Sequence, residues 1–110
     1  MDIITFKKEH IDDVIDFEKE LRKQEDVYGW EIDETYIKNL SESFLDPRFD
    51  NSLTLLAVID NRVVGRIDVS FIATHFDGSI RAYLDWISVH KSHRHQGIAQ
   101  ALLNEMIARL

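Results

Sequence analysis

The sequence of 110 residues contains no cysteine, and this absence excludes disulfide bonds and thiolate-bound metal sites. It suits a reducing compartment. No apolar run approaches the roughly 20 residues that are needed to cross a bilayer. The N-terminus, Met1-Asp2-Ile3-Ile4-Thr5, also lacks the basic and then apolar layout of a signal peptide. We therefore expect a cytoplasmic protein that forms one domain over residues 1–110.

Positive charge is scarce, because 13 Lys and Arg residues stand against 20 Asp and Glu residues and give a formal net charge of −7. A chain this acidic is a poor candidate for general nucleic-acid binding, which depends on neutralising phosphates. The acidity suits a cationic substrate such as an amine, and plain solubility explains it as well. Residues 90–95 (His-Lys-Ser-His-Arg-His) form one basic island that contains no acid.

Hydrophobic spacing predicts three helices. The first runs from about His10 to about Gln24, and the second follows Asp33, which is a good N-cap. Pro47 stops the second helix, because the residue before a proline disfavours helical backbone. The third helix starts near Gly97 and is the most clearly amphipathic, with an apolar stripe of Ala99, Leu102, Leu103, Met106, Ile107 and Leu110.

Alternating apolar residues predict strands in the rest of the chain. The expected strands cover residues 2–7, residues from Ser52 to the turn at Asp60-Asn61, about Arg62 to about Ala73, and about Ile80 to Val89. Gly65 would mark a bulge, and Asp77-Gly78 would make a turn. The order β-α-α-β-β-β-α is that of an α/β layered domain. Because the sequence stops on an apolar helix without a glycine cap, we expect the end to be a cut within a domain.

The segment Val89–Ala99 is the most informative about chemistry. A strand leads into a polar loop, which leads directly into a helix, so several backbone N–H groups and the positive end of the helix dipole face one space. Gly97 would let a ligand approach the backbone, Ala99 would keep the helix near the sheet, and Arg94 adds a positive charge. The expected ligand is a phosphate or pyrophosphate. The Walker pattern and the Gly-x-Gly-x-x-Gly fingerprint are both absent.

The residues Arg94-x-x-Gly97-x-Ala99 resemble the pyrophosphate loop of the GNAT (GCN5-related N-acetyltransferase) superfamily, Gln/Arg-x-x-Gly-x-Gly/Ala. The approach Leu84-x-x-Ile87-x-Val89 and the order of elements are also similar to that family. The resemblance implies a mixed, mostly antiparallel sheet flanked by helices. It also implies that the chain is C-terminally truncated and lacks the usual last strand, helix, strand and strand.

The same resemblance implies acetyl-CoA as cofactor. The backbone amides of Arg94, His95, Gln96, Gly97, Ile98 and Ala99 would hold the coenzyme A pyrophosphate. The backbone of Ile87, Ser88 and Val89 would pair with the pantetheine arm and polarise the thioester carbonyl. The reaction would be direct acetyl transfer to a primary amine, with no metal.

Other roles are predicted less directly. Asp85 would be a general base or an anchor for the amine, or simply a partner for Arg66 or Arg81. By alternation it would share a face with Tyr83, Ile87 and Val89. Tyr83 would form a wall of the substrate site or pack in the core. Tyr28 and Trp30, between the first two helices, would line the acceptor site or anchor their loop.

Alternatives remain open at this point. His90, His93 and His95 are close enough in sequence to suggest a metal cluster, but their spacing suits neither a helix nor a strand. The chain is either an N-acetyltransferase, a catalytically incomplete fragment that binds coenzyme A, or an interaction module acting through an open sheet edge. That edge and the last helix predict a homo-oligomer, as a dimer. The amine acceptor is not predicted beyond a small molecule or a peptide, with no nucleic acid or membrane partner.

Overall fold

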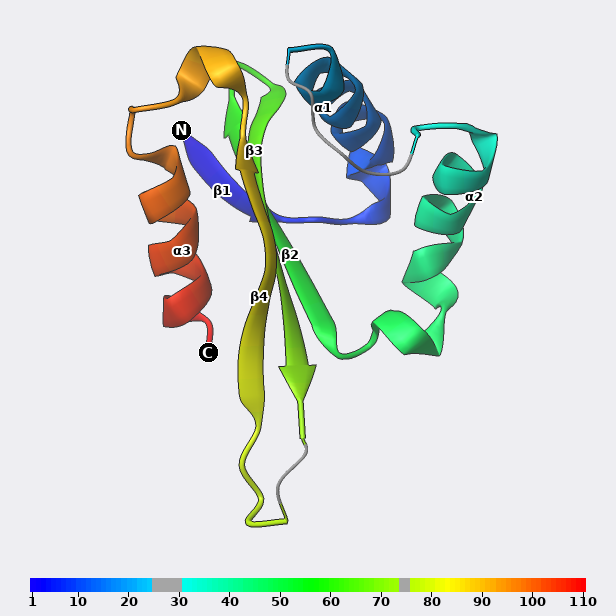
Figure 1. The fold of residues 1–110 in the computed structure, drawn as a ribbon, viewed down its shortest axis with the longest axis vertical. Helices are drawn as coiled ribbons and strands as arrows, with labels where there is room; N and C mark the ends of the chain where they lie inside the picture. Colours follow the sequence, from blue (N-terminus) through cyan, green and yellow to red (C-terminus); the bar gives the residue numbers. More distant parts are fainter. Residues whose placement is uncertain (25–30, 74–75) are drawn as a thin grey trace.

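A computed structural model describes residues 1–24, 31–73 and 76–110, and its elements follow the order β-α-α-β-β-β-α expected from the sequence (Figure 1). Their bounds are β1 Asp2–Thr5, α1 Ile11–Gln24, α2 Glu34–Glu42, β2 Ser52–Ile59, β3 Arg62–Ile72, β4 Arg81–Val89 and α3 Ile98–Ala108. Short 3-10 turns occupy Lys8–His10, Ser43–Leu45, Pro47–Phe49 and Lys91–His93. The chain is therefore an α/β domain, as predicted.

The four strands form one sheet in the order β1-β2-β3-β4, and all three pairings are antiparallel. Asp60 and Asn61, at φ 51° and 63°, make the tight turn between β2 and β3 that their residue types predicted. β3 and β4 continue as a hairpin beyond the helices (Figure 1). β1 and β4 are the two edge strands of the described sheet.

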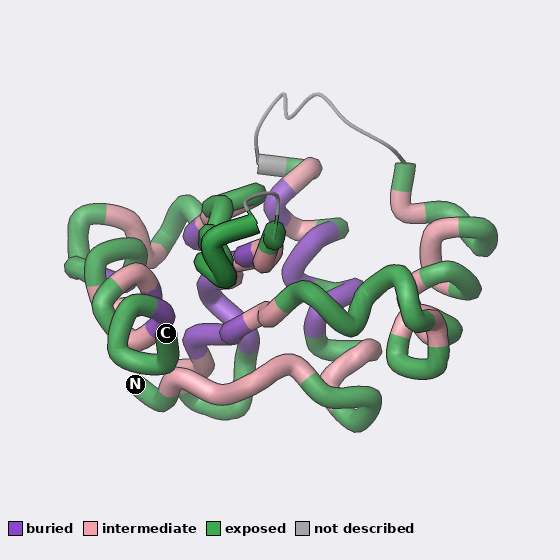
Figure 2. The backbone as a smooth tube through the Cα atoms, turned by 90° about the horizontal axis from the view of Figure 1, so that it is seen from below, coloured by how far each residue is buried: buried purple, intermediate pink, exposed green. Residues whose placement is uncertain are grey.

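Helices cover both faces of this sheet, which explains why β2 is apolar on both sides. On one face, Leu55 and Ile67 pack with Leu102 of α3. On the other, Leu56 and Val63 pack with Phe17 of α1. α3 lies on one side of the sheet, and α1 and α2 lie on the other (Figure 1), so that the buried residues gather in the middle layer (Figure 2).

The ends of α2 follow from local chemistry. The Oδ1 atom of Asp33 accepts a hydrogen bond from the Tyr36 N–H at 2.9 Å, as expected for an N-cap. At the other end the chain passes through a 3-10 turn to Asp46, whose φ of −94° and ψ of 116° are the extended values expected before Pro47. Residues 46–51 therefore form the connection that leads directly into β2.

The apolar stripe predicted for α3 is partly wrong. The buried residues of the helix are Ile98, Leu102 and Met106, whereas Ala99 is exposed, and Ile107 and Leu110 are 58% and 63% exposed. The helix contacts the sheet through one row of side chains, Ile98, Leu102 and Met106, which are spaced four residues apart. A sheet that packs on a helix touches only one side of it, so the other apolar residues stay exposed.

The close approach of α3 to the sheet was also assigned to the wrong residue. Gly65 of β3 provides it, since a Cβ built there would lie 3.1 Å from Leu102 Cδ1 and 3.2 Å from Ile98 Cγ2. The predicted bulge at this glycine is present: Ala57 faces Gly65 and Val58 faces Val63, so Val64 is the extra residue.

We predict that Gly65→Val lowers the free energy of unfolding by about 1–3 kcal/mol, because the added methyls overpack the contact with α3. Urea unfolding followed by circular dichroism measures this loss. Gly65→Ala is the graded control and should cost less, since the two nearest side-chain methyl groups can move by a few tenths of an ångström. Equal stability of Gly65→Val and the unmodified chain would contradict this packing.

Candidate functional site

The loop between β4 and α3 is fixed to the rest of the protein by His90. This residue is 5% exposed, and its backbone N–H donates to the Val64 carbonyl of β3 at 2.7 Å. Its Nδ1 accepts from the Ser92 N–H at 3.2 Å, and its Nε2 lies 3.0 Å from Glu20 Oε1 of α1. These partners assign the proton to Nε2. His90 therefore fixes the start of the loop between the sheet and α1.

The contact with His90 also affects Glu20. The hydrogen bond from His90 lowers the pKa of the Glu20 carboxyl below its ordinary value, and Arg62 contributes in the same direction. A carboxylate whose pKa is lower in the folded state stabilises the fold above the unfolded-state pKa. That contribution is lost as the pH falls through the folded-state pKa.

Beyond the 3-10 turn, the backbone turns its N–H groups toward one space. His95 and Gly97 have left-handed backbone, with φ of 62° and 79°, and Gln96 lies between them. The first intrahelical bond of α3 runs from the Ala101 N–H to the Gly97 carbonyl, at 2.9 Å. The N–H groups of residues 98–100 therefore have no partner within the helix. Such an array, at the positive end of the helix dipole, suits an anionic group.

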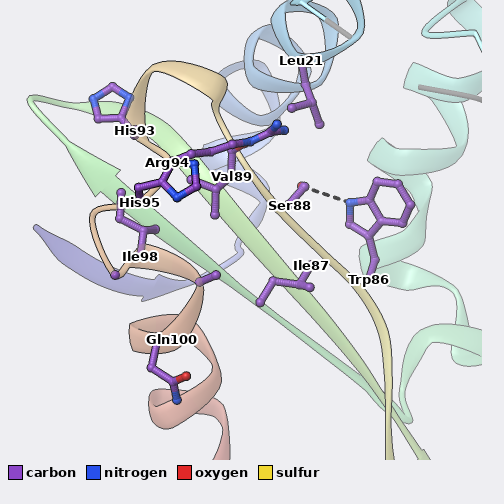
Figure 3. Close-up of a pocket in the computed structure, with 12 residues that line it drawn as sticks. Leu21, Trp86, Ile87, Ser88, Val89, His93, Arg94, His95, Ile98 and Gln100 are labelled. Carbon is purple, nitrogen blue, oxygen red and sulfur yellow. Dashed lines mark hydrogen bonds between the residues drawn. The ribbon is translucent and has the colours of Figure 1, made fainter. Parts of the chain in front are cut away.

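These N–H groups border a cleft of about 630 Å³ between the loop and the end of β4, which we call the loop cleft (Figure 3). Its lining consists of Leu21, Trp86, Ile87, Ser88, Val89, His93, Arg94, His95, Gly97, Ile98, Ala99 and Gln100. Of the nine residues predicted to bind the cofactor, eight line this cleft, and Gln96 is absent from the lining. The structure thus brings the predicted strand edge and the predicted loop together.

Arg94 crosses the cleft from the loop toward Leu21 of α1 (Figure 3). Its Nε donates to the Val89 carbonyl at 3.2 Å. This bond holds the side chain against the end of β4, and its fixed positive charge adds to that of the helix dipole in the same cleft. A phosphate or pyrophosphate fits this chemistry.

The edge of β4 supplies a second set of polar groups. The His90 N–H points to β3, and hydrogen bonding alternates along an antiparallel pair. The N–H and carbonyl groups of Ile87 and Val89 consequently point away from β3, toward the loop cleft. An extended chain can therefore pair with this edge as a further strand would.

The predicted face of Asp85 needs a correction. Asp68 faces Trp86 and Val69 faces Leu84, so Asp85 is the extra residue of a bulge in β4. The bulge moves Ile87 and Val89 to the α3 face of the sheet, where they pack with the core. Asp85 instead lies on the opposite face with Ser70, whose hydroxyl donates to Asp85 Oδ2.

Tyr83 is opposite Ser70 in the sheet and so lies on the same face as Asp85. It is 48% exposed. It is absent from the lining of both clefts described here, so its part in a substrate wall stays a prediction. Tyr28 and Trp30 lie outside the described residues.

Asp85 borders a second cleft of about 580 Å³, on the α1 side of the sheet, which we call the second cleft. It is lined by Glu18, Arg48, Phe49, Asn51, Ser52, Thr54, Arg66, Asp68, Ser70, Phe71, Asp85 and Trp86. Trp86 lines both clefts, and its indole N–H donates to Ser88 Oγ at 3.0 Å (Figure 3). The two clefts therefore meet at the bulged part of β4.

A network of charged residues forms the inner wall of the second cleft. Glu18, which is 2% exposed, lies 2.5 Å from Arg22 Nη1 and 3.2 Å from Arg66 Nη1. Arg66 Nε also donates to Asp68 at 3.0 Å. Burial disfavours the charge of Arg66, but the carboxylates of Asp68 and Glu18 more than offset that cost and raise the pKa of Arg66 above its ordinary value.

Sequence reasoning missed this network, although a signal for it was present. Glu18 lies on the apolar side of α1, one turn after Val14 and next to Phe17, where a carboxylate needs a partner. Arg66, Asp68 and Ser70 alternate along one face of β3, where all three line the second cleft. What the sequence does not specify is that α1 crosses this strand so that Glu18 meets Arg66.

The three histidines of the basic island do not gather. His90 bonds to Ser92 and Glu20, and its ring stands nearly at a right angle to that of His93, at 5.7 Å. Within residues 1–24, 31–73 and 76–110, no three His, Asp or Glu side chains are grouped closely enough to hold a metal ion. His93 Nδ1 is buried and has no hydrogen-bond partner among the described residues.

Residues 14–110 match the acetyltransferase (GNAT) family, and the chain belongs to that family. A search of curated proteins found no match. No helix in the described ranges is long and apolar enough to span a membrane.

Solved structures agree with this fold. The chain is 21% identical to a ribosomal-protein-alanine N-acetyltransferase from Brucella melitensis biovar Abortus 2308, with 99% of this chain and 71% of that chain covered and a TM-score of 0.73. It is 15% identical to an aminoglycoside acetyltransferase from an uncultured soil metagenomic sample, in complex with sisomicin, with 97% and 67% covered and a TM-score of 0.78.

A third structure is that of AAC(6')-Iy in complex with a bisubstrate analog, CoA-S-monomethyl-acetylneamine. The chain is 22% identical to it, with 94% of this chain and 67% of that chain covered and a TM-score of 0.67. At these identities the likeness to all three structures shows the fold alone.

Proposed function

We propose that this chain is an acetyl-CoA-dependent N-acetyltransferase that acts on a primary amine. The observation that carries the proposal is the loop cleft, where the outward-facing edge of β4 and the N–H groups that open α3 border one space. Membership of the acetyltransferase (GNAT) family supports the same reading. Acetyl-CoA would supply the acetyl group and the leaving thiolate.

Different groups of the chain would bind different parts of acetyl-CoA. The N–H groups from Arg94 to Ala99, with the Arg94 guanidinium, would hold the pyrophosphate. The backbone of Ile87, Ser88 and Val89 would align the pantetheine arm, and the outward N–H groups of Ile87 and Val89 would stabilise negative charge that develops on a carbonyl oxygen beside them. Leu21 and Ile98 add apolar side chains to the lining of the cleft.

The second cleft is the proposed place for the amine. Because both clefts meet at Trp86, an amine beside Asp85 would approach a thioester held along β4 from the opposite side of the strand. The Asp85 carboxylate would attract the ammonium form and accept a proton from it, and the free amine is the nucleophile. Tyr83, Tyr28 and Trp30 stay predicted contributors to the acceptor site.

Release of free thiol tests this proposal. Because the protein has no cysteine, every thiol that a colorimetric thiol reagent detects would come from coenzyme A. We expect thiol to be released from acetyl-CoA only when both the chain and an amine are present. The Arg94→Glu substitution should lower the rate of this release at least tenfold. Binding of acetyl-CoA without turnover for any amine would contradict the proposed enzymatic activity. The chain would then be a catalytically incomplete fragment that binds coenzyme A.

Self-association and location stay predictions. The described surfaces that favour a homo-oligomer are the open edge of β4, where Leu84 is 51% exposed, and the outer side of α3, where Ile107 is 58% exposed. Light scattering of the same sample gives its mass. The cytoplasmic location rests on the sequence features given above.

A further inference from the structure

We propose that the acceptor of this protein is an amphipathic primary amine, with a single ammonium group on an apolar, preferably aromatic body. The inference rests on the proposed function, because it assigns a substrate class to the second cleft. It is carried by the balance of charges among the described residues of that cleft, where Asp85 is the carboxylate without a cationic partner, and by the aromatic side chains that line the same cleft.

Three of the described residues that line the second cleft carry carboxylates, and two of these carboxylates are already neutralised. Both oxygens of Glu18 are held by guanidinium groups, those of Arg22 at 2.5 Å and Arg66 at 3.2 Å. Asp68 accepts from Arg66 Nε at 3.0 Å and from Thr54 Oγ1 at 2.5 Å. A second ammonium group on a ligand would have to displace a guanidinium from these buried pairs, and that costs more than it gains.

Arg48, at the rim of the cleft, is neutralised as well. Its Nε and Nη2 donate to Asp46, at 2.9 Å and 2.5 Å. The pair lowers the pKa of the Asp46 carboxyl, first through the hydrogen bonds from Arg48. Arg48 and Asp46 therefore add no net charge to the rim.

Among the lining residues that the structure describes, Asp85 is the carboxylate that no cationic side chain neutralises. Its recorded partner is the Ser70 hydroxyl, which donates a hydrogen bond but brings no positive charge. The bulge places this carboxylate on the same face as the neighbouring Trp86. One cation is therefore accommodated, and it sits next to an indole.

Aromatic side chains line the same cleft as that carboxylate. Phe49 lines the cleft from the 3-10 turn before β2 and is 50% exposed, so the fold buries only half of its ring. Trp86 lines the cleft from the strand. An ammonium at Asp85 would leave the rest of the ligand against these two rings, where burial of apolar area favours an aromatic body over a hydrated, polycationic one.

Direct binding tests the inference without depending on turnover. The dissociation constants of 2-phenylethylamine and spermidine are measured by NMR titration at 0.15 M salt, with and without saturating coenzyme A. We expect 2-phenylethylamine to bind at least tenfold more tightly than spermidine. Asp85→Asn should weaken it at least tenfold, whereas Asp77→Asn, in the turn between β3 and β4, should leave it unchanged. Phe49→Ala should reduce the preference over spermidine.

The outcomes separate this inference from the proposed function. Spermidine binding as tightly as 2-phenylethylamine, or neither amine binding, would overturn the amphipathic acceptor. Tight, Asp85-dependent binding of 2-phenylethylamine in a chain that does not bind acetyl-CoA would uphold the cleft assignment and refute the transferase. Where turnover occurs, Asp85→Asn should raise the KM for the amine and leave that for acetyl-CoA unchanged.

Discussion

Replacing Gly97 by tryptophan should abolish binding of acetyl-CoA. Gly97 lines the loop cleft, and a Cβ built on it meets nothing within 4 Å, so a large side chain would fill the space in front of the N–H groups. Its φ of 79° is left-handed, which costs a non-glycine residue about 1–2 kcal/mol in addition. Isothermal titration calorimetry should detect no saturable binding to Gly97→Trp.

Gly97→Ala separates the two effects, because alanine carries the same backbone cost without the volume. We expect it to bind acetyl-CoA within about thirtyfold of the unmodified chain, because strain of about 1–2 kcal/mol corresponds to about 5- to 30-fold in affinity. Gly78→Ala, at a φ of 85° in the turn between β3 and β4, is a further control and should bind normally. Unaffected binding by Gly97→Trp would show that the loop cleft is not the cofactor site.

The largest loss of stability is expected for Glu18→Ala. The change leaves Arg22 and Arg66, with side chains only 17% and 15% exposed, facing each other without the carboxylate between them. Removing one partner from a buried ion pair typically costs about 3–5 kcal/mol. Urea unfolding followed by circular dichroism measures this directly. Glu18→Gln keeps the shape and part of the hydrogen bonding, and should remain folded if Glu18→Ala does not.

An exposed ion pair provides the matched control. Glu105 and Arg109 stand one turn apart on α3 at 3.1 Å, with side chains 42% and 33% exposed. Such pairs are worth about 0.3–0.5 kcal/mol on a helix, so Glu105→Ala should have little effect. If Glu18→Ala and Glu18→Gln both cost no more than Glu105→Ala, the network does not stabilise the fold.

The parts of the structure that were predictable depend on neighbours in sequence. Asp33 caps α2 and Asp60-Asn61 turn the hairpin because each residue type suits its own backbone geometry. The loop from Arg94 to Ala99 belongs to the same group, since a strand, a glycine and a helix in succession determine where the N–H groups point. That is why the geometry of this loop was predictable from the sequence, whereas its binding of a cofactor stays a prediction.

The parts that were missed depend on contacts between distant segments. Strict alternation put Asp85 with Ile87 and Val89, whereas the bulge that separates them arises from pairing with β3. Ala99 was assigned the contact that Gly65 makes, because a sequence does not state which side of α3 meets the sheet. The Glu18 network likewise depends on the crossing of α1 and β3.

The central claim is that the loop cleft binds acetyl-CoA, and calorimetric titration of the purified 110-residue chain with acetyl-CoA tests it most directly. The structure predicts saturable binding of one acetyl-CoA per chain, and its loss in Arg94→Glu. A folded sample that takes up no acetyl-CoA would contradict the claim, and the chain would then not hold the cofactor by the residues named here.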